Sequence, residues 1–252
     1  MSGRTRLAIK AAGLLAFLAA WQVEAMLGLI DPAVLPPPTV VVVDTARSLT
    51  PGELGTQIWA SAKRAYLGFA VGGVLGLVLG IGVAWRRTVG AAVKTPAELL
   101  RPIPPLAWIP LAIMWFGIGD GSKVFVIAFG AFYPIFTSAE KGVRTLEPVL
   151  VRAARALGLR GWPLMQRVVL PAIVPELATG IRVAWSLSFA SLVAAELLAS
   201  ESGLGFMLAR ARVDGEFSII VTAILIIALL ALVSERVFRW LVLRPYLEWM
   251  SA

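Results

Sequence analysis

The amino-acid sequence predicts an all-α integral membrane protein, a single domain over residues 1–252 with six transmembrane helices. Of the 252 residues, 59% are hydrophobic and 15% are charged, whereas soluble domains are nearer half apolar and about a quarter charged. The mean hydropathy is +0.84, and several apolar runs reach the roughly 20 residues that a helix needs to cross a ~30 Å hydrocarbon core. The chain therefore suffices for one compact bundle of about six spans, with no separate soluble domain.

The expected spans are residues 7–30, 65–85, 99–118, 124–140, 173–199 and 218–241. The first span follows basic residues and resembles a secretory signal. Its apolar part is about twenty residues long, however, and no small-residue cleavage site precedes Trp21, so we expect an uncleaved span. With the N-terminus in the cytoplasm, 16 Lys and Arg residues fall in inner segments and 6 in outer ones. This excess of positive charge predicts that both termini are cytoplasmic.

Glycines recur at every fourth position of the second span, at Gly68, Gly72, Gly76 and Gly80. This spacing places small residues along one stripe of the helix and lets another helix approach closely. The stripe is typical of static packing. A sliding or gating interface is the alternative that the pattern leaves open.

Prolines interrupt the third span at Pro102, Pro104, Pro105 and Pro110, so several backbone carbonyls lose their helical partners. Such carbonyls must be satisfied inside the protein or by water, and transporters place broken helices beside their pathways. Pro104, Pro105 and the neighbouring Trp108 are therefore pathway candidates. A kinked helix that only packs is the alternative, and Trp108 is equally explained by packing or by an interfacial position.

One inner loop, residues 141–171, is much longer than the others. Residues 149–157 carry Ala, Leu and Arg at helical spacing, and Gly158 follows as the expected end of that helix. Residues 162–170 form a second expected short helix, which Pro171 would stop. A helical pair at the cytoplasmic face has the shape of a docking surface. An interfacial amphipathic helix that anchors the loop is equally compatible with the periodicity.

The fifth span contains two charged residues, Arg182 and Glu196, and each costs on the order of 3 kcal/mol near the bilayer centre unless it is solvated or paired. They are 14 residues apart, so roughly 21 Å of helix separates them and they cannot pair with each other. Their angular offset of about 40° places both on one face of the helix. The same face carries Trp185, Ser186, Phe189 and Val193. We expect this face to meet water or polar partners along a pathway, and the alternative is that the two charges extend to opposite interfaces.

The connection after the fifth span contains Gly203 and Gly205. A Gly-x-Gly turn by itself indicates a tight bend. Its place between the fifth span and a short amphipathic segment through Arg212 also makes it a candidate gate loop.

The absence of Cys and His excludes several classes of chemistry. Disulfides, thiols and imidazole ligands are missing, so no metal or redox site is expected. The sequence has no Gly-x-x-x-x-Gly-Lys-Ser/Thr loop, so we predict that the chain holds no cofactor and is not itself an ATPase or another enzyme. The net charge is +8, but the basic residues are dispersed between apolar runs, which argues against nucleic-acid binding.

The long inner loop resembles the cytoplasmic signature of binding-protein-dependent ABC importer permeases. That signature is Glu-Ala-Ala, three residues, Gly, nine residues and Ile-x-Leu-Pro. The matching positions in this sequence are Arg152, Ala153, Ala154, Gly158, Val168, Leu170 and Pro171. Valine for isoleucine at 168 is innocuous. Arg152 stands where the signature has Glu, so a carboxylate contact with the ATPase does not carry over from the family.

Residues 101–111 (RPIPPLAWIPL) and 115–120 (WFGIGD) are similar to the taurine, aliphatic-sulfonate and nitrate permease group, most closely to its taurine branch. Residues 193–197 and 203–207 fit the same group. The resemblance implies a type I importer fold, in which residues 141–171 form the coupling loop with its cytoplasmic coupling helix. It also implies a homodimer in the lipid of the bacterial inner membrane, two cytoplasmic ATPase subunits that bind ATP and Mg, and a periplasmic or lipid-anchored binding protein.

The resemblance further implies a small anionic or zwitterionic substrate, with taurine or a related sulfonate first and nitrate or a heterocyclic vitamin precursor as the alternative. Two other functional classes make different predictions. A secondary carrier that works alone would show charged residues near the midplane and two similar halves. An intramembrane enzyme needs a cluster of ionisable catalytic groups. Neither pattern is evident in the sequence.

Overall fold

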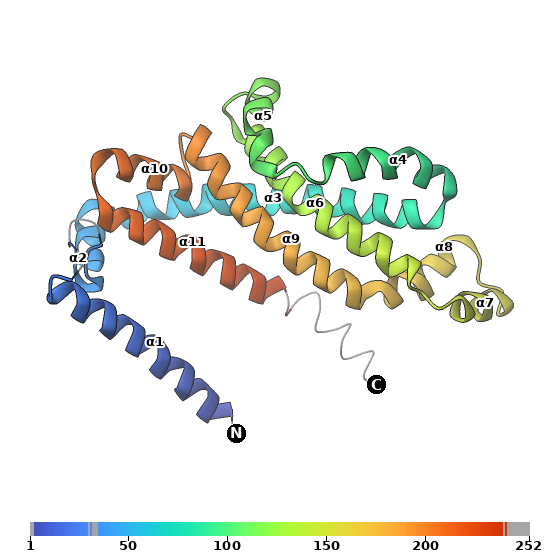
Figure 1. Cartoon of the computed structure of the whole chain (residues 1–252), viewed down its shortest axis with the longest axis horizontal. Helices are drawn as coiled ribbons and strands as arrows, with labels where there is room; N and C mark the ends of the chain where they lie inside the picture. Colours follow the sequence, from blue (N-terminus) through green and yellow to red (C-terminus); the bar gives the residue numbers. More distant parts are fainter. Residues whose placement is uncertain (1–2, 30, 32–34, 239, 241–252) are drawn as a thin grey trace.

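The computed structural model describes residues 3–29, 31, 35–238 and 240, and this part of the chain is built of helices and their connections (Figure 1). The elements are α1 (Gly3–Met26), α2 (Pro38–Ser48), α3 (Pro51–Trp85), α4 (Arg87–Leu100), η1 (Pro105–Trp108), α5 (Ile109–Phe116), α6 (Asp120–Arg144), α7 (Pro148–Ala156), α8 (Gly161–Leu164), η2 (Met165–Val169), α9 (Leu170–Ala199), α10 (Leu204–Asp214) and α11 (Phe217–Phe238). Among these residues, 5 helices are long and apolar enough to cross a membrane, and a bent pair raises the number to 6. The predicted fold class is confirmed.

The second span begins earlier than predicted, because α3 starts at Pro51 rather than at residue 65. Its start is a capping box: the Glu53 N–H donates to Thr50 Oγ1 at 3.3 Å, and the Thr50 N–H donates to the Glu53 carboxylate at 2.9 Å. Pro51 occupies the first turn, where its missing N–H leaves no helical hydrogen bond unmade. Lys63 and Arg64, which were expected in an outer segment, are therefore helical residues.

The predicted third span, residues 99–118, is not one helix. α4 ends at Leu100, and η1 and α5 follow at an angle of 94° to it. The prolines at 102, 104 and 105 explain the break, because each lacks a backbone N–H and disfavours helix in the residue before it. Pro110, expected to interrupt the span, lies instead in the first turn of α5. Figure 1 shows α4 lying along α3 while α5 projects from the bundle.

The centre of the molecule consists of three long helices, with α6 packed between α3 and α9. A Cβ at Gly76 of α3 would lie 2.6 Å from the Phe132 carbonyl oxygen of α6. A Cβ at Gly180 of α9 would lie 2.7 Å from the Pro134 carbonyl oxygen of α6. α6 therefore touches both neighbours backbone to backbone, which favours static packing over a sliding surface.

The connection between α6 and α9, residues 145–169, contains α7, α8 and η2, and we call it the coupling segment. Figure 1 shows α7 and α8 at one end of the molecule and α2 and α10 towards the other. α8 passes through the π turn η2 into α9, so Gly161–Ala199 is one helix. The predicted stop at Pro171 is wrong. Pro171, which lacks an N–H, lies in the first turn of α9. The wider π turn comes directly before it, and in that turn the Leu170 N–H donates to the Met165 carbonyl.

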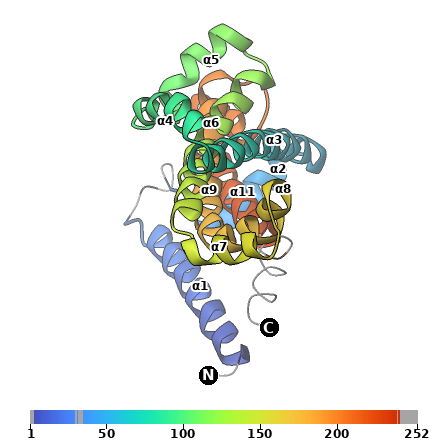
Figure 2. The same cartoon turned by 90° about the vertical axis from the view of Figure 1, so that its right-hand side faces the viewer.

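The remaining helices surround this centre unevenly. α10 and α11 share an apolar cluster of Leu204, Met207, Ala211, Ile219 and Ala223. α1 lies apart from the bundle in both views (Figure 2). The predicted spans 7–30 and 218–241 fall on α1 and α11, and their last residues, 30, 239 and 241, lie outside the described residues.

Candidate functional site

Two regions of the described chain lie at opposite ends of the α6–α9 pair. The coupling segment joins the C-terminus of α6 to the N-terminus of α9. A buried polar network gathers at the other ends of the same two helices. α6 has 25 residues, so roughly 36 Å of helix separates the two regions.

Within the coupling segment, α7 ends in a Schellman motif built on Gly158. The Gly158 N–H donates to the Arg155 carbonyl and the Leu159 N–H donates to the Ala154 carbonyl, both at 3.0 Å. Gly158 has a φ of +87°, a left-handed conformation that favours glycine. Gly158 thus ends α7 and turns the chain sharply towards α8.

The coupling segment presents a basic and apolar surface. Ala154 is buried, Arg152 and Ala153 are exposed, and Leu170 and Pro171 are half-buried where α9 begins. Four of its arginines are exposed and form no ion pair with the described residues: Arg152, Arg155, Arg160 and Arg167. Exposed apolar side chains lie in the same segment, namely Val149, Leu150, Leu157 and Trp162. An exposed apolar patch among unpaired charges indicates a surface that another molecule covers.

The structure divides the predicted polar face of α9. Arg182 and Ser186 are exposed. Trp185 and Phe189 are buried in an apolar cluster that also contains Ala65, Ile127 and Leu192. The aromatic residues fill the space between α9 and the other core helices, so these four side chains do not form one surface towards water.

The pathway candidates of the third span lie at the break between α4 and α5. Pro104 is exposed and Pro105 is half-buried at the start of η1. Trp108 packs against Phe129 of α6, with ring centroids 5.0 Å apart. The element that begins at Pro105, η1, therefore packs against α6 and also contacts α9.

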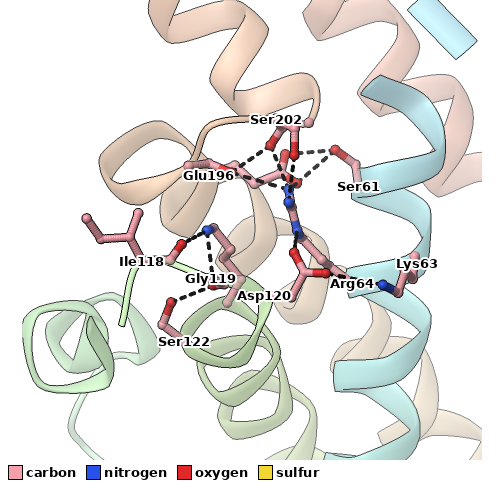
Figure 3. A network of polar contacts seen from close by, with 12 residues as sticks. Ser61, Lys63, Arg64, Ile118, Gly119, Asp120, Ser122, Glu196 and Ser202 are labelled. Atoms are coloured by element: carbon pink, nitrogen blue, oxygen red, sulfur yellow. Dashed lines mark hydrogen bonds and ion pairs between the residues drawn. The ribbon is translucent and has the colours of Figure 1, made fainter. Parts of the chain in front are cut away.

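Glu196 is buried, and Figure 3 shows its polar contacts with Arg64 and Ser61. Its side chain is 0% exposed, and Arg64 Nη1 lies 2.8 Å from Glu196 Oε1. Ser61 Oγ lies 2.9 and 2.8 Å from the two carboxylate oxygens, and the Gly205 N–H donates to Oε2 at 2.9 Å. Glu196 therefore meets polar partners, one of the environments expected for this face, and a helix that is distant in sequence supplies its counter-charge. Its place along a pathway stays a prediction.

Arg64 is the centre of this cluster, which we call the Arg64 network: Ser61, Arg64, Asp120, Glu196 and Ser202. The Arg64 side chain is 6% exposed. Nε donates to Asp120 Oδ1 at 2.7 Å. Nη1 donates to the Ser202 carbonyl at 2.6 Å as well as to Glu196, and Nη2 donates to Ser202 Oγ at 2.8 Å. One guanidinium therefore joins α3 to the start of α6, the end of α9 and the connection that follows α9, which its five fixed donors make possible.

Two lysines lie beside the network. Asp120 also accepts from Lys63 at 3.3 Å, and these two side chains are 45% and 51% exposed. Lys123 is buried, and its Nζ donates to the carbonyl oxygens of Ile118 and Gly119. Of the two buried cations, Arg64 pairs with both carboxylates of the network, and Lys123 is satisfied by backbone carbonyl oxygens.

Gly203 and Gly205 fit tightly against Glu196. Gly203 has a φ of +111°, and a Cβ there would overlap the Glu196 carboxylate. A Cβ at Gly205 would lie 2.6 Å from Glu196 Cβ. The Gly203 N–H donates to Gln57 Oε1 of α3 at 2.5 Å. The two glycines therefore allow the connection after α9 to close over the network.

Sequence reasoning missed Ser61, Arg64 and Asp120. Hydropathy placed the start of the second span after Arg64 and so assigned this arginine to a loop. The Thr50-x-x-Glu53 pattern was an available signal, because a capping box there predicts a helix that includes Ser61 and Arg64 three residues apart on one face. We find no comparable signal that pairs either residue with Glu196.

Comparison with known proteins decides the family. Residues 72–245 match the family described as "Binding-protein-dependent transport system inner membrane component", and this match includes α6, the coupling segment and α9. The chain belongs to this family of ABC importer permeases. The predicted recognition is thereby confirmed, and so is the expectation of a transport subunit rather than an enzyme.

The permease is similar to transport permeases with several named substrates. It is 34% identical to the "Putative aliphatic sulfonates transport permease protein" of Bacillus subtilis over 93% of this chain and 85% of that protein. It is 37% identical to the "Taurine transport system permease protein" of Escherichia coli over 86% of this chain and 81% of that protein. It is 31% identical to the "Nitrate import permease protein" of Synechococcus elongatus over 89% of this chain and 84% of that protein.

Proposed function

We propose that this permease and a second copy of it form the translocation pathway of an ATP-driven importer. Two ATPase subunits, which bind ATP and Mg, dock on the coupling segments, and a binding protein delivers the solute at the opposite face. The observation that carries the proposal is the coupling segment itself. It leaves the bundle between the two tightly packed helices α6 and α9, so closure of the ATPase subunits on ATP would move both helices together.

A Gly158→Pro variant tests this role. Proline fixes φ near −65°, whereas Gly158 has a φ of +87°, so the substitution destroys the turn between α7 and α8. We expect loss of ATP-driven uptake in proteoliposomes that contain the permease, its ATPase and its binding protein. Gly215→Pro is the control, because Gly215 has a φ of +75° at the end of α10, in the other half of the molecule. Normal assembly and uptake by Gly158→Pro would reject the coupling role.

We propose that both termini and the coupling segment face the cytoplasm of a bacterial cell. The support is the distribution expected from the sequence, with 16 Lys and Arg residues in inner segments against 6 in outer ones. Two of those 6, Lys63 and Arg64, lie in α3, so the excess on the inner side remains. The sequence has no cysteine, so single cysteines at exposed positions report the orientation. A membrane-impermeant thiol reagent added to spheroplasts should label Val213→Cys and not Leu157→Cys. The reverse pattern would invert the topology.

We propose a small organosulfonate as the substrate, with taurine first and another sulfonate second. The support is the similarity to permeases named for aliphatic sulfonates and for taurine. The nitrate relative makes nitrate the alternative, and a heterocyclic vitamin precursor is a further one from the sequence. Calorimetry on the partner binding protein decides among them. Nitrate binding without sulfonate binding would favour the alternative.

We propose that exposed Arg182 on α9 is a transient partner for the anionic group of the substrate. We propose the broken span around Pro104, Pro105 and Trp108 as a second part of the pathway wall. The break in its helix leaves backbone polar groups without helical partners, and such groups can face a pathway. Arg64 is a poor candidate for substrate binding, since its guanidinium is already hydrogen-bonded within the Arg64 network.

A further inference from the structure

The Arg64 network and the coupling segment act on the same pair of helices from opposite ends. Asp120 lies in the first turn of α6 and Glu196 lies in the last turn of α9. The coupling segment joins the other ends of these helices. We propose that Arg64 and Glu196 are positioning residues that clamp the loop 200–205 onto α3, α6 and α9, so that this loop moves with the coupling segment as one body. This proposal rests on the transport function proposed above.

The clamp is built to remain closed. Glu196 is fully buried, and both of its oxygens accept hydrogen bonds. Arg64 holds Asp120, Glu196 and Ser202 at the same time. Opening the network would leave a carboxylate and a guanidinium buried without partners, which is strongly unfavourable. We therefore infer that the network persists through the transport cycle.

The loop is held by more than the arginine. The Leu204 N–H donates to Ser61 Oγ at 2.8 Å, and the Gly205 N–H donates to Glu196 at 2.9 Å. The first backbone N–H groups of α10, which no helical carbonyl can satisfy, are thus bound by α3 and α9. α10 begins directly from the clamp, so its position follows that of the network.

The packed helices α3, α6 and α9, which lie between the Arg64 network and the coupling segment, form a stiff unit. α3 and α6 meet through the glycine stripe, and α6 and α9 meet at Gly180, in each case with backbone in direct contact. At the coupling-segment end, Lys141 Nζ lies 2.8 Å from Glu176 Oε1 and joins α6 to α9 again. Displacement of the coupling segment is therefore transmitted to the loop 200–205 and is not absorbed within the bundle.

Spin-label distances test the clamp directly in the full-length chain, which has no native cysteine. Labels at Gly55→Cys on α3 and Glu201→Cys on the loop report the loop position. Both sites are exposed. Labelled copies are diluted with unlabelled ones so that only distances within one subunit are measured. We expect one narrow distance distribution in the unmodified background. We expect at least a twofold broader one in Arg64→Lys, which keeps the charge and loses the planar fork.

Lys63→Gln is the matched control, because Lys63 is the adjacent residue on α3 and its ion pair with Asp120 joins two half-exposed side chains. Its distribution should equal that of the unmodified background. Ser202→Ala is the milder variant in case Arg64→Lys does not fold. It removes one hydroxyl from the loop and keeps the Arg64–Glu196 pair, and we expect a smaller broadening. An unchanged distribution in both Arg64→Lys and Ser202→Ala would overturn the proposal.

Transport measurements on the complex with ATPase and binding protein give the second readout. We expect Arg64→Lys and Glu196→Gln each to lower the solute imported per ATP hydrolysed by about tenfold while the complex still assembles. The double variant should lose no more than the worse single variant, since both act through one clamp. Parallel losses of ATPase activity and uptake at a constant ratio would overturn the proposal. Failure of the unmodified permease to bind any ATPase would refute the proposed transport function, whereas the label distances would still judge the clamp.

Discussion

Direct backbone contact between α3 and α6 predicts different effects for the same substitution at two neighbouring glycines. A Cβ at Gly76 would lie 2.6 Å from the Phe132 carbonyl oxygen, about 0.8 Å short of an ordinary contact. Backbone atoms cannot rotate away, so the helices must separate. Overpacking of this kind costs about 1–3 kcal/mol, against a helix-propensity gain of up to about 1 kcal/mol for Gly→Ala. We expect Gly76→Ala to lower the free energy of unfolding by about 1–2 kcal/mol.

Gly73→Ala is the control, because Gly73 lies one turn away on the same helix. A Cβ there would meet only the tip of the Ile135 side chain, at 3.4 Å. The propensity gain then remains, and we expect a neutral effect or a stabilisation of up to about 1 kcal/mol. Unfolding in mixed detergent micelles measures both free energies. Equal effects of the two substitutions would refute the close contact and would reopen the sliding interface.

Three further predictions concern the exposed candidates. Gly158→Ala strains the left-handed turn by about 1–2 kcal/mol and should weaken co-purification with the ATPase. Gly215→Ala, with the same strain at the end of α10 and away from the coupling segment, should not, and equal co-purification of the two variants would contradict the role of the turn. Arg152→Glu should change the free energy of unfolding by no more than about 0.5 kcal/mol and should weaken co-purification with the ATPase. Unchanged co-purification would show that Arg152 is not part of the contact with the ATPase. Arg182→Ala should likewise leave stability unchanged and lower uptake of an anionic solute, and unchanged uptake would end its pathway assignment.

Hydropathy and short motifs predict the parts of this molecule that depend on local sequence. The sequence shows the spans around α3, α6 and α9 as apolar runs, because each helix that crosses the bilayer needs an apolar surface along its whole length. The end of α7 is visible because only glycine readily takes the left-handed turn there. The break at Pro105 is visible because proline lacks a backbone N–H.

The Arg64 network was not predictable from local sequence, because its members come from helices that are far apart in the chain. Arg64 and Glu196 are each costly alone and are compensated only when α3 and α9 are neighbours. Hydropathy therefore assigned Arg64 to a loop, and the helical spacing of α9 assigned Glu196 to a candidate pathway face. The direct run of α8 into α9 was also missed, because a proline after a short helix normally indicates its end, and only the π turn lets the helix continue through Pro171.

Cross-linking of the coupling segment to the ATPase tests the central claim most directly. Leu157 is 84% exposed in the coupling segment, and Val213 is 85% exposed on α10, so cysteines at the two positions react equally well unless a partner covers one. In the assembled complex, we predict that a short bifunctional thiol reagent joins Leu157→Cys, and not Val213→Cys, to the ATPase subunit, and that ATP alters the yield. Absence of a cross-link at Leu157→Cys, with the same thiol reactivity whether or not the ATPase is bound, would contradict the account.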